Sequence, residues 1–445
     1  MKNGYGVVFI VDENGRFISV INDGDIRRGI LKGKQLADNV MTISSDTPFY
    51  VLDNMSKEEI AGFINKKNNL KNKIQYGGTL KVPVLDKNKL ITNVLFISIN
   101  DSGVCIIDHD CRSPNKMREI KKNKNILVTG GAGYLGSILC KKLLDNDYKV
   151  KVLDNLMYGD HGIRQFLNNP NFKLIKGDIR NIQIVVESIK DVDAVIHLAA
   201  IVGDPATTKF PQESIDVNYL ATKAIVEVCK YYQVNRFIFA STCSVYGYQS
   251  EEDSGLTINS KLNPLSLYAK MKLESEKAIL SLADDYFSPL VLRMATLYGL
   301  SPRMRFDLAV NFLSAEAVIK KEIVIFGGSQ WRPFLHVEDA ANAYVKCLEL
   351  PFRKVRKKIL NLGQNNQNYQ MLRVGRMIKK LIPGTKLGIS KKEVDSRNYK
   401  VLFDDTVKNI DFHADYKVSD GIAEIRDRIL EGDFIDYRDK KYRNV

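Results

Sequence analysis

Tyr268 and Lys272 stand four residues apart in the stretch Tyr-Ala-Lys-Met-Lys, which opens a predicted helix. Residues i and i+4 share one helical face, so these two side chains lie side by side. A free tyrosine has a pKa near 10, but an adjacent ammonium favours the phenolate and lowers that pKa. Tyr268 could thus take a proton from a substrate hydroxyl. The alternative is a surface pair, since Tyr-x-x-x-Lys is common by chance.

A hydroxyl residue, Thr242, ends an apolar, strand-like stretch that begins at Phe237. A hydroxyl at the end of a buried strand can hydrogen-bond the same substrate oxygen that Tyr268 deprotonates. Thr242, Tyr268 and Lys272 are therefore the predicted catalytic trio, and they need a fold that brings a strand end to a helix start.

Glycines at positions 130, 133 and 136 follow directly after an apolar strand, residues 125–129. Gly130 allows a tight turn, Gly133 lets the backbone approach a pyrophosphate, and Gly136 lets helix and strand pack closely. The N-terminus of the next helix then faces the phosphates with free N–H groups. The pattern predicts a dinucleotide site.

Asp154 ends a second strand, about 20 residues beyond the glycines. A carboxylate there can hold both ribose hydroxyls of NAD and would repel the 2′-phosphate of NADP. Asn155 follows, at the place where an arginine would be expected for NADP. The predicted cofactor is NAD, and Lys272 could also bridge to its nicotinamide ribose.

Strand-like and helix-like segments alternate after residue 124, which is typical of a parallel sheet with helices on both faces. The sequence predicts an α/β fold, a Rossmann-type doubly wound parallel sheet with a small C-terminal substrate lobe from about residue 300. The predicted strands are 125–129, 149–153, 172–176, 194–198, 236–240 and 289–293. The predicted helices include 213–232, 267–283, 307–320, 337–350 and 418–430.

Composition restricts the function further. The 445 residues carry a net charge of +14, which suggests an anionic partner, but no nucleic-acid motif accompanies it, so a nucleotide diphosphate is favoured over nucleic acid. No apolar run approaches the roughly 18 residues of a membrane span. Six scattered cysteines show no disulfide framework. We expect a cytoplasmic protein without a membrane partner.

With these motifs in this order, residues 124 to about 430 resemble the extended short-chain dehydrogenase/reductase superfamily, in its nucleotide-sugar epimerase/dehydratase branch. The stretches that carry the resemblance are 129–136, 177–180, 197–200, 292–299 and 331–339. The resemblance implies that Asp178 meets the adenine. The residues it implies around NAD are Gly130, Gly133, Tyr134, Leu135, Gly136, Asp154, Asn155, Asp178, Ile179, Leu198, Ala199, Ala200, Tyr268 and Lys272.

The same resemblance implies a substrate that is a nucleotide diphosphate sugar. Arg332 and Arg397 match two segments whose arginines contact the diphosphate, and Asn218 falls where a helix asparagine completes the catalytic set. Arg303 and Arg305 lie in a segment similar to a subset of the branch associated with surface-polysaccharide sugars. These two arginines could clamp phosphates bidentately or lie in a solvated loop.

The residues after Thr242 discriminate between reactions. Nucleotide-sugar 4,6-dehydratases place carboxylates there, whereas this chain has Cys243 and Ser244. Reductases that also epimerise at C3 and C5 carry cysteine at the position of Ser244, and a shift of one residue at a strand end swaps faces. Cys243 is therefore expected to pack or line the cofactor. We favour a 4-epimerase over a 4-ketoreductase or dehydrogenase, and rank a dehydratase below both.

Residues 1–111 are predicted to be a separate α+β module, joined by a polar, basic linker at 112–123. A hairpin around the Asp12–Gly15 turn, with a helix starting near Asp25, resembles a CBS repeat, and residues 82–91 resemble the matching strands of a second one. Such pairs can bind an adenine nucleotide, but Asn22 and Leu95 replace the expected ribose-reading hydroxyls, so a structural or dimerising role is favoured over nucleotide sensing. A nucleotide sensor without catalysis and a dead scaffold are further alternatives.

Three smaller expectations complete the list. Cys105, His109 and Cys111 lack a clear fourth ligand, so no metal site is predicted. Gly203-Asp-Pro205 is expected to shape the sugar pocket. The superfamily resemblance implies a homodimer through the helices at 213–232 and 267–283.

Overall fold

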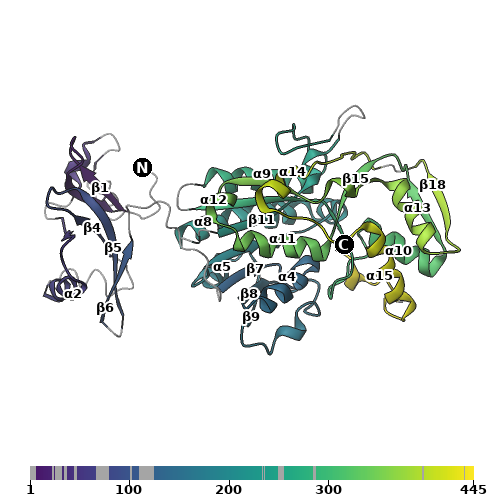
Figure 1. The fold of residues 1–445 in the computed structure, drawn as a ribbon, viewed down its shortest axis with the longest axis horizontal. Helices are drawn as coiled ribbons and strands as arrows, with labels where there is room; N and C mark the ends of the chain where they lie inside the picture. Colours follow the sequence, from purple (N-terminus) through teal and green to yellow (C-terminus); the bar gives the residue numbers. More distant parts are fainter. Residues whose placement is uncertain are drawn as a thin grey trace. The chain divides into compact units, whose positions relative to one another are not determined.

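The computed structural model of the chain forms two compact units, Met1–Glu119 and Ile120–Val445 (Figure 1). It describes residues 7–22, 25, 33–34, 38–44, 48–66, 80–100, 103–109, 125–232, 234, 236–248, 255–283, 287–392, 395–434 and 436–444. The predicted linker at 112–123 and Cys111 lie outside these residues, as does most of the helix predicted to start near Asp25.

The N-terminal unit contains two sheets. Strands β1 (Val7–Val11) and β2 (Phe17–Asn22) form the predicted antiparallel hairpin. The second sheet has the order β3-β4-β5-β6, with strands Val51–Leu52, Leu80–Leu85, Ile91–Asn100 and Gly103–His109. Helix α2 (Lys57–Lys66) packs its buried Ile60 and Ile64 into a core with this sheet. A short 3-10 helix, η1, spans Val40–Thr42.

The turns between β1 and β2 and between β4 and β5 have the same hydrogen bonds. Asp12 Oδ1 accepts from Asn14 N at 2.9 Å and from Arg16 N at 2.8 Å. Asp86 Oδ1 accepts from Asn88 N and Leu90 N at the same two distances. The equivalent residues Arg16 and Leu90 form an antiparallel bridge with each other. The two hairpin turns thus share one hydrogen-bonding pattern and are joined by this bridge.

The C-terminal unit is built on a seven-stranded parallel sheet with the order β16-β12-β11-β10-β7-β8-β9. All six predicted strands lie in it: β7 (Asn125–Thr129), β8 (Lys149–Asp154), β9 (Phe172–Lys176), β10 (Ala194–His197), β11 (Arg236–Thr242) and β12 (Ser288–Met294). The seventh strand, β16 (Lys358–Leu362), was not predicted. Strand order reverses between β7 and β10, and crevices form at such switch points of doubly wound sheets.

Helices cover both faces of this sheet. Helices α4 (Tyr134–Asp145) and α11 (Val337–Glu349) pack together on one face. Helices α5 (Ile182–Ile189), α8 (Thr222–Tyr231) and α9 (Leu267–Ser281) cover the other. Alternation along each strand separates the two cores, because Ile126 and Val128 face one helical layer and Leu127 faces the other.

The segment predicted as one helix at 213–232 is three pieces. Helix α7 (Pro211–Ile215) leads into a π-helical turn, Asp216–Ala221, which leads into α8. A π-turn is wider than an α-turn and is common at functional sites. The predicted helix is thus correct in extent and wrong in its interior geometry.

The later part of the unit is a smaller lobe of short sheets and helices. Its strands are β13 (Thr296–Tyr298), β14 (Glu322–Phe326), β15 (Trp331–His336), β17 (Asn368–Gln370) and β18 (Lys386–Ser390). Its longer helices are α10 (Ala309–Lys320), α13 (Met371–Leu381) and α15 (Val418–Leu430). Short helices of the unit are η2 (Arg164–Phe166), α6 (Asp204–Lys209), η4 (Cys243–Tyr246), α12 (Phe352–Val355), η5 (Asn365–Gln367), α14 (Asp404–Ile410) and η6 (Lys440–Tyr442).

Among the described residues, no helix is long and apolar enough to cross a bilayer.

Candidate active site

The glycine turn after β7 leaves no room for a side chain at Gly130 or Gly136. Gly130 has a φ of 73°, and a Cβ placed there would lie 2.7 Å from the backbone nitrogen of Ala199. A Cβ on Gly136 would collide with the carbonyl oxygen of Gly130. Gly133 is the residue before the first turn of α4, so the N-terminus of that helix opens onto the turn. The backbone geometry is that of a phosphate cradle.

Asp154 holds this turn from the end of β8. Its Oδ2 accepts from Ala132 N at 3.0 Å and its Oδ1 accepts from Leu156 N at 2.8 Å. Burial raises the pKa of Asp154, and these two N–H donors oppose that rise. The next acidic residue along this edge, Asp178, is paired with Arg180 at 2.7 Å, which lowers its pKa.

One cavity runs along the carboxyl edge of the sheet. Its wall contains every residue that the sequence assigned to NAD: Gly130, Gly133, Tyr134, Leu135, Gly136, Asp154, Asn155, Asp178, Ile179, Leu198, Ala199, Ala200, Tyr268 and Lys272. Arg303 and Arg305 also line it, as do Met294 and Leu297 from the segment 292–299 that carries the resemblance. Sequence reasoning missed Met157, Tyr158, Glu213 and Asn444; Glu213 lies in α7, and the other three lie outside helices and strands.

Tyr268 and Lys272 lie in the first turns of α9, which Ser266 caps through a hydrogen bond from Ala269 N at 3.2 Å. Lys272 is buried, and its Nζ donates to the carbonyl oxygen of Ala240 at 2.8 Å. The Nζ lies 5.9 Å from the centre of the Tyr268 ring. Burial lowers the pKa of Lys272 to about 7, against the opposing effect of Glu276.

The electrostatics of Tyr268 differ from the sequence argument. Desolvation raises the pKa of Tyr268, and the cation that opposes this rise is Arg305 rather than Lys272. The charge of Asp204 raises the same pKa further. The ammonium of Lys272 is bonded to the carbonyl oxygen of Ala240, and burial lowers its pKa. Lys272 therefore lowers the pKa of Tyr268 less than the four-residue spacing led us to expect.

Thr242 ends β11, as predicted, and its side-chain oxygen accepts from Ser244 N at 3.1 Å. Ser244 Oγ lies 3.1 Å from the hydroxyl of Tyr399. Cys243 is buried with its sulfur 3.2 Å from the carbonyl oxygen of Arg293, and burial raises its pKa. The thiol is thus packed away as a neutral group.

Asn218, which the resemblance places in the catalytic set, has both ends of its side-chain amide bonded to the backbone of Ile201. It is buried in the π-helical turn, where its Oδ1 accepts from Ile201 N at 2.8 Å and its Nδ2 donates to Ile201 O at 2.9 Å. Both ends of the amide are therefore used to hold the loop after β10, whose residues Leu198 to Ile201 line the cavity. Asn218 is a positioning residue for that wall.

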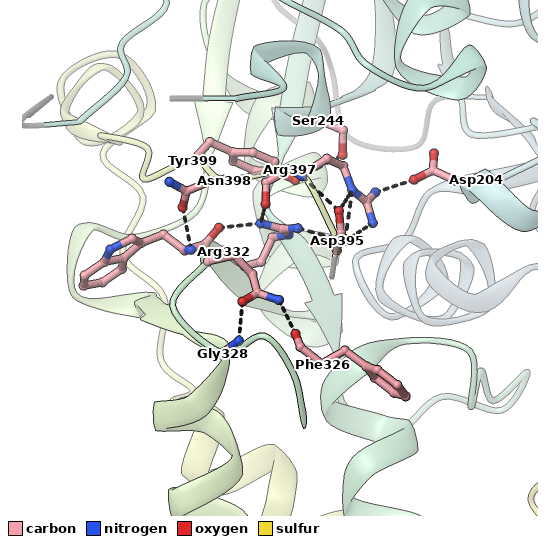
Figure 2. Close-up of polar contacts among 11 residues, drawn as sticks. Asp204, Ser244, Phe326, Gly328, Arg332, Asp395, Arg397, Asn398 and Tyr399 are labelled. Atoms are coloured by element: carbon pink, nitrogen blue, oxygen red, sulfur yellow. Dashed lines mark hydrogen bonds and ion pairs between the residues drawn. The ribbon is translucent and has the colours of Figure 1, made fainter. Parts of the chain in front are cut away.

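Arg332 and Arg397 form a cluster outside the cofactor cavity (Figure 2). Arg397 Nη2 pairs with Asp395 Oδ2 at 2.5 Å, and Arg397 Nη1 pairs with Asp204 Oδ2 at 2.6 Å. Arg332 Nη2 pairs with the same Asp395 oxygen at 2.8 Å. Arg332 Nη1 also donates to Trp331 O at 2.7 Å and to Arg397 O at 2.5 Å. The arginine cluster comprises Asp204, Arg332, Asp395 and Arg397.

Each guanidinium of this cluster has spare donors. A guanidinium carries five N–H groups, and the contacts found among the described residues use three of those on Arg332 and three of those on Arg397. Two N–H groups on each side chain can therefore reach another acceptor.

Arg303 and Arg305 lie in the cofactor cavity and not with Arg332 and Arg397. Arg305 pairs with Asp307 at 2.6 Å and lowers the pKa of Tyr268. Arg303 stacks over the Tyr158 ring at 4.1 Å from its centre, and burial lowers its pKa to about 10. Both arginines are buried, so the solvated-loop alternative is wrong.

Next to the predicted catalytic trio lies a buried polar network that the sequence analysis did not find. Glu276 and Arg293 pair at 2.7 Å with side chains 2% exposed. Arg293 Nη1 donates to Tyr246 OH at 3.1 Å, which donates to Asn361 Oδ1 at 2.7 Å, and Ser241 Oγ donates to Glu276. The sealed network comprises Ser241, Tyr246, Glu276, Arg293 and Asn361. Glu276 follows Lys272 by four residues, so Tyr-x-x-x-Lys-x-x-x-Glu was the signal available.

Comparison with known proteins defines the class. Residues 126–363, more than half of the chain, match the sequence profile of the NAD dependent epimerase/dehydratase family. The chain belongs to this family of enzymes, which confirms the predicted enzyme class, the NAD cofactor and the Rossmann-type sheet.

Two curated relatives illustrate the family. The putative UDP-glucose 4-epimerase of Methanocaldococcus jannaschii is 32% identical over 249 residues, 54% of this chain and 77% of that protein. The UDP-glucose 4-epimerase of Bacillus subtilis is 28% identical over 280 residues, 58% of this chain and 81% of that protein.

Two solved structures are similar in fold. UDP-glucuronic acid 4-epimerase from Bacillus cereus, in complex with UDP-glucuronic acid and NAD, aligns with a TM-score of 0.61 and 27% identity, covering 69% of this chain and 99% of that one. MoeE5 in complex with UDP-glucose and NAD aligns with a TM-score of 0.59, the same identity and the same coverage.

Proposed function

We propose that this chain is an NAD-dependent nucleotide-sugar 4-epimerase. The observation that carries the proposal is a single cavity edge that joins the glycine turn, Asp154 and the pair Tyr268–Lys272. NAD bound there supplies a hydride acceptor that later becomes the donor. Oxidation of a sugar carbon followed by reduction from the other face inverts that carbon without net redox change.

Tyr268 is the proposed acid/base. It takes the proton of the sugar hydroxyl when the carbon is oxidised and returns it on reduction. Thr242 holds the same oxygen from the end of β11, and Arg305 favours the phenolate, since its charge lowers the pKa of Tyr268. Lys272 is placed to hold the nicotinamide ribose from beneath the Tyr268 ring.

The neighbours of Thr242 support epimerisation over dehydration. Elimination of water needs acid and base groups for the neighbouring carbons, and the positions after Thr242 carry a buried neutral thiol and a serine bound to Tyr399. A 4-ketoreductase or dehydrogenase shares this site, and remains the second candidate because the same trio would serve it.

The arginine cluster is the proposed diphosphate site, with two spare N–H groups on each of Arg332 and Arg397 for phosphate oxygens. Arg303 and Arg305 share the cavity of the glycine turn, so we assign their phosphate contacts to the cofactor rather than to the sugar nucleotide. This division gives each diphosphate its own pair of arginines.

The test is turnover of nucleotide sugars by purified protein, scored by NMR as interconversion of two C4 epimers such as UDP-glucose and UDP-galactose. An epimerase retains its NAD between turnovers, so cofactor should be released only on denaturation. Tyr268→Phe should lower turnover by about 10³-fold or more while NAD stays bound. Near-normal turnover by this variant would refute the assignment. Stoichiometric consumption of added NAD or NADH would establish the reductase or dehydrogenase instead.

For the N-terminal unit we infer a tandem CBS-like module. The turns at Asp12 and Asp86 have the same hydrogen bonds, and a β-bridge between Arg16 and Leu90 joins them. Both observations support a duplicated motif. The proposed ligand is an adenine nucleotide between the copies. Titration with AMP, ADP and ATP should raise the melting temperature of the full chain, and no shift with any of them would remove the sensing role.

We further infer a homodimer through α8 and α9. Leu220 and Tyr231 are exposed beside this pair of helices, at 50% and 78%. Light scattering should give twice the 50.4 kDa mass of one chain.

A further inference from the structure

The last described residues of the chain, 436–444, reach back to the cofactor cavity. Asn444 is buried and lines that cavity. Its carbonyl oxygen accepts from the hydroxyl of Tyr158 at 3.4 Å, and the carbonyl oxygen of Arg443 accepts from Nη2 of Arg303 at the same distance. Tyr158 and Arg303 line the cavity as well. This segment therefore joins two cavity walls that come from distant parts of the sequence.

Arg303 indicates where along the cavity the segment lies. Its guanidinium stacks on the Tyr158 ring, 4.1 Å from the ring centre. A Cβ placed on Gly162 would lie 3.2 Å from the Cβ of Arg303 and 2.8 Å from the carbonyl oxygen of Ala132, so Arg303 stands beside the glycine turn. Burial raises the pKa of Asp154, and the charge of Arg303 opposes that rise. The segment thus meets the cavity between the phosphate cradle and the carboxylate expected to hold the ribose.

The loop that carries Arg303, residues 301–306, lies against the N-terminus of α4. Ser301 Oγ donates to the carbonyl oxygen of Tyr134 at 2.7 Å and lies 3.0 Å from Ser137 Oγ, both in the first turn of that helix. A diphosphate at this N-terminus would therefore have the glycine turn on one side and the Arg303 loop on another. Movement of the loop is then one route by which a bound dinucleotide could leave.

An aromatic cluster fixes the segment to this loop. Phe306 is fully buried, and its ring is edge-on to three rings whose centres lie 5.4, 5.9 and 5.7 Å away, those of Phe434, Tyr437 and Tyr442. The backbone N–H of Phe306 also donates to the carbonyl oxygen of Tyr442 at 2.9 Å. Edge-on aromatic pairs stabilise beyond the area that they bury. The Arg303 loop is therefore held in place by residues from the end of the described chain.

We propose that residues 436–444 are a clasp that retains NAD in its site. The clasp holds the Arg303 loop beside the cofactor diphosphate through the rings around Phe306, and Asn444 completes the cavity wall. It lies beyond residues 126–363, the part of the chain that matches the family profile. The inference goes beyond the proposed reaction, because retention depends on the cofactor and not on the sugar.

The experiment measures the release of NAD from the purified full chain. Protein loaded with radiolabelled NAD is mixed with an excess of unlabelled NAD, and the label that stays on the protein is followed over time. Tyr442→Ala removes two ring contacts, those with Phe306 and Phe434, and leaves every cavity residue in the chain. Release should become at least about tenfold faster than from wild-type protein.

Tyr442→Phe is the matched control, because it keeps the ring in the cluster, and it should release NAD at the wild-type rate. Tyr442→Leu is measured beside it, since an apolar side chain at this position preserves the fold should alanine not do so. Its release should be at least about threefold faster than that of wild-type protein. The melting temperature and circular dichroism of each variant establish that it is folded.

Three results would overturn the clasp. They are wild-type release rates in folded Tyr442→Ala and Tyr442→Leu, equal acceleration in Tyr442→Phe, and wild-type protein that exchanges its label before the first measurement. The proposed function fails differently. Slow, ring-dependent release without interconversion of any C4 epimers would keep the clasp and refute the epimerase, whereas epimerisation with immediate exchange would do the reverse.

Discussion

The sealed network and the arginine cluster both pair arginine with carboxylate, but they differ in exposure and in how many hydrogen-bonding groups have partners. Glu276 and Arg293 are 2% exposed, and their neighbours Ser241 and Tyr246 supply further hydrogen bonds. In the cluster, Asp204 and Arg397 are 28% and 29% exposed, with an acceptor and several donors unused. The closed network fixes a strand end in place, whereas the open one keeps the donors that the proposed diphosphate site requires.

Lys272 lies between the two regions and gives the largest expected effect. Its pKa of about 7 lies below its ordinary 10.5, so folding disfavours the protonated form. This penalty is complete below pH 7, shrinks as the pH rises from 7 to 10.5, and is absent above that range. Lys272→Met should therefore raise the free energy of unfolding at pH 6 by up to about 5 kcal/mol, with the gain vanishing near pH 10.5.

Urea unfolding at several pH values measures this difference. Lys270→Met, an exposed change on the same helix, is the control and should show no pH-dependent gain. A difference for Lys272→Met that stays constant across the range would contradict the role of burial.

Breaking the sealed network should lower the free energy of unfolding by nearly as much as the Lys272 change raises it. Arg293→Leu leaves Glu276 charged, buried and unpaired, which typically costs about 3–5 kcal/mol. Chemical denaturation gives the value, and retained stability would show that the network is less closed than the contacts imply. This variant tests stability, because Arg293 contacts no residue of the catalytic trio through its side chain.

The equivalent change in the arginine cluster should act on binding. Arg397→Gln removes donors to a phosphate, each worth about 1.5–3 kcal/mol, so the dissociation constant for UDP should rise by about 10- to 100-fold. Unfolding free energy should fall by less than about 1 kcal/mol, because this pair is part-exposed. Calorimetric titration with UDP measures this dissociation constant. A stability loss like that of Arg293→Leu, with unchanged UDP affinity, would remove the distinction between the two regions.

Two tyrosines give the smallest and most closely matched test. Tyr246→Phe removes a hydroxyl that both accepts from Arg293 and donates to Asn361, and should cost about 2 kcal/mol. Tyr399→Phe removes one contact with Ser244 at the open site and should cost about 1 kcal/mol or less. Thermal or urea unfolding compares them directly. The reverse order would mean that the open region is the more tightly bonded one.

The sheet was predictable because its signals are local. Six parallel strands followed from short apolar runs, and the glycine turn and Asp154 lay directly at strand ends. The seventh strand, β16, has the mixed sequence Lys-Ile-Leu-Asn-Leu, whose Asn361 is buried only because Tyr246 and the carbonyl of Leu402 satisfy it. No local sequence pattern predicts a buried polar residue whose hydrogen-bond partners lie far away in the sequence.

The sequence predicts which residues line the site better than it predicts the contacts that they make. The cavity wall contains the residues that motifs supplied, but the pairing of Arg332 with the backbone of Arg397 spans 65 positions of sequence. The resemblance placed Asn218 in the catalytic set, but no spacing predicted that its side-chain amide would bond the backbone of Ile201. Spacing predicts which residues share a face, while partners across the fold decide what each side chain does.

The π-helical turn at Asp216–Ala221 has a consequence for how this segment can vary. Such a turn closes over one residue more than an ordinary helical turn. Deleting any single residue there would let the helix tighten and rotate the preceding stretch by about 100°, carrying the amide of Asn218 away from Ile201. Among relatives, we therefore expect the length of this stretch and the asparagine at the position of Asn218 to be kept or lost together.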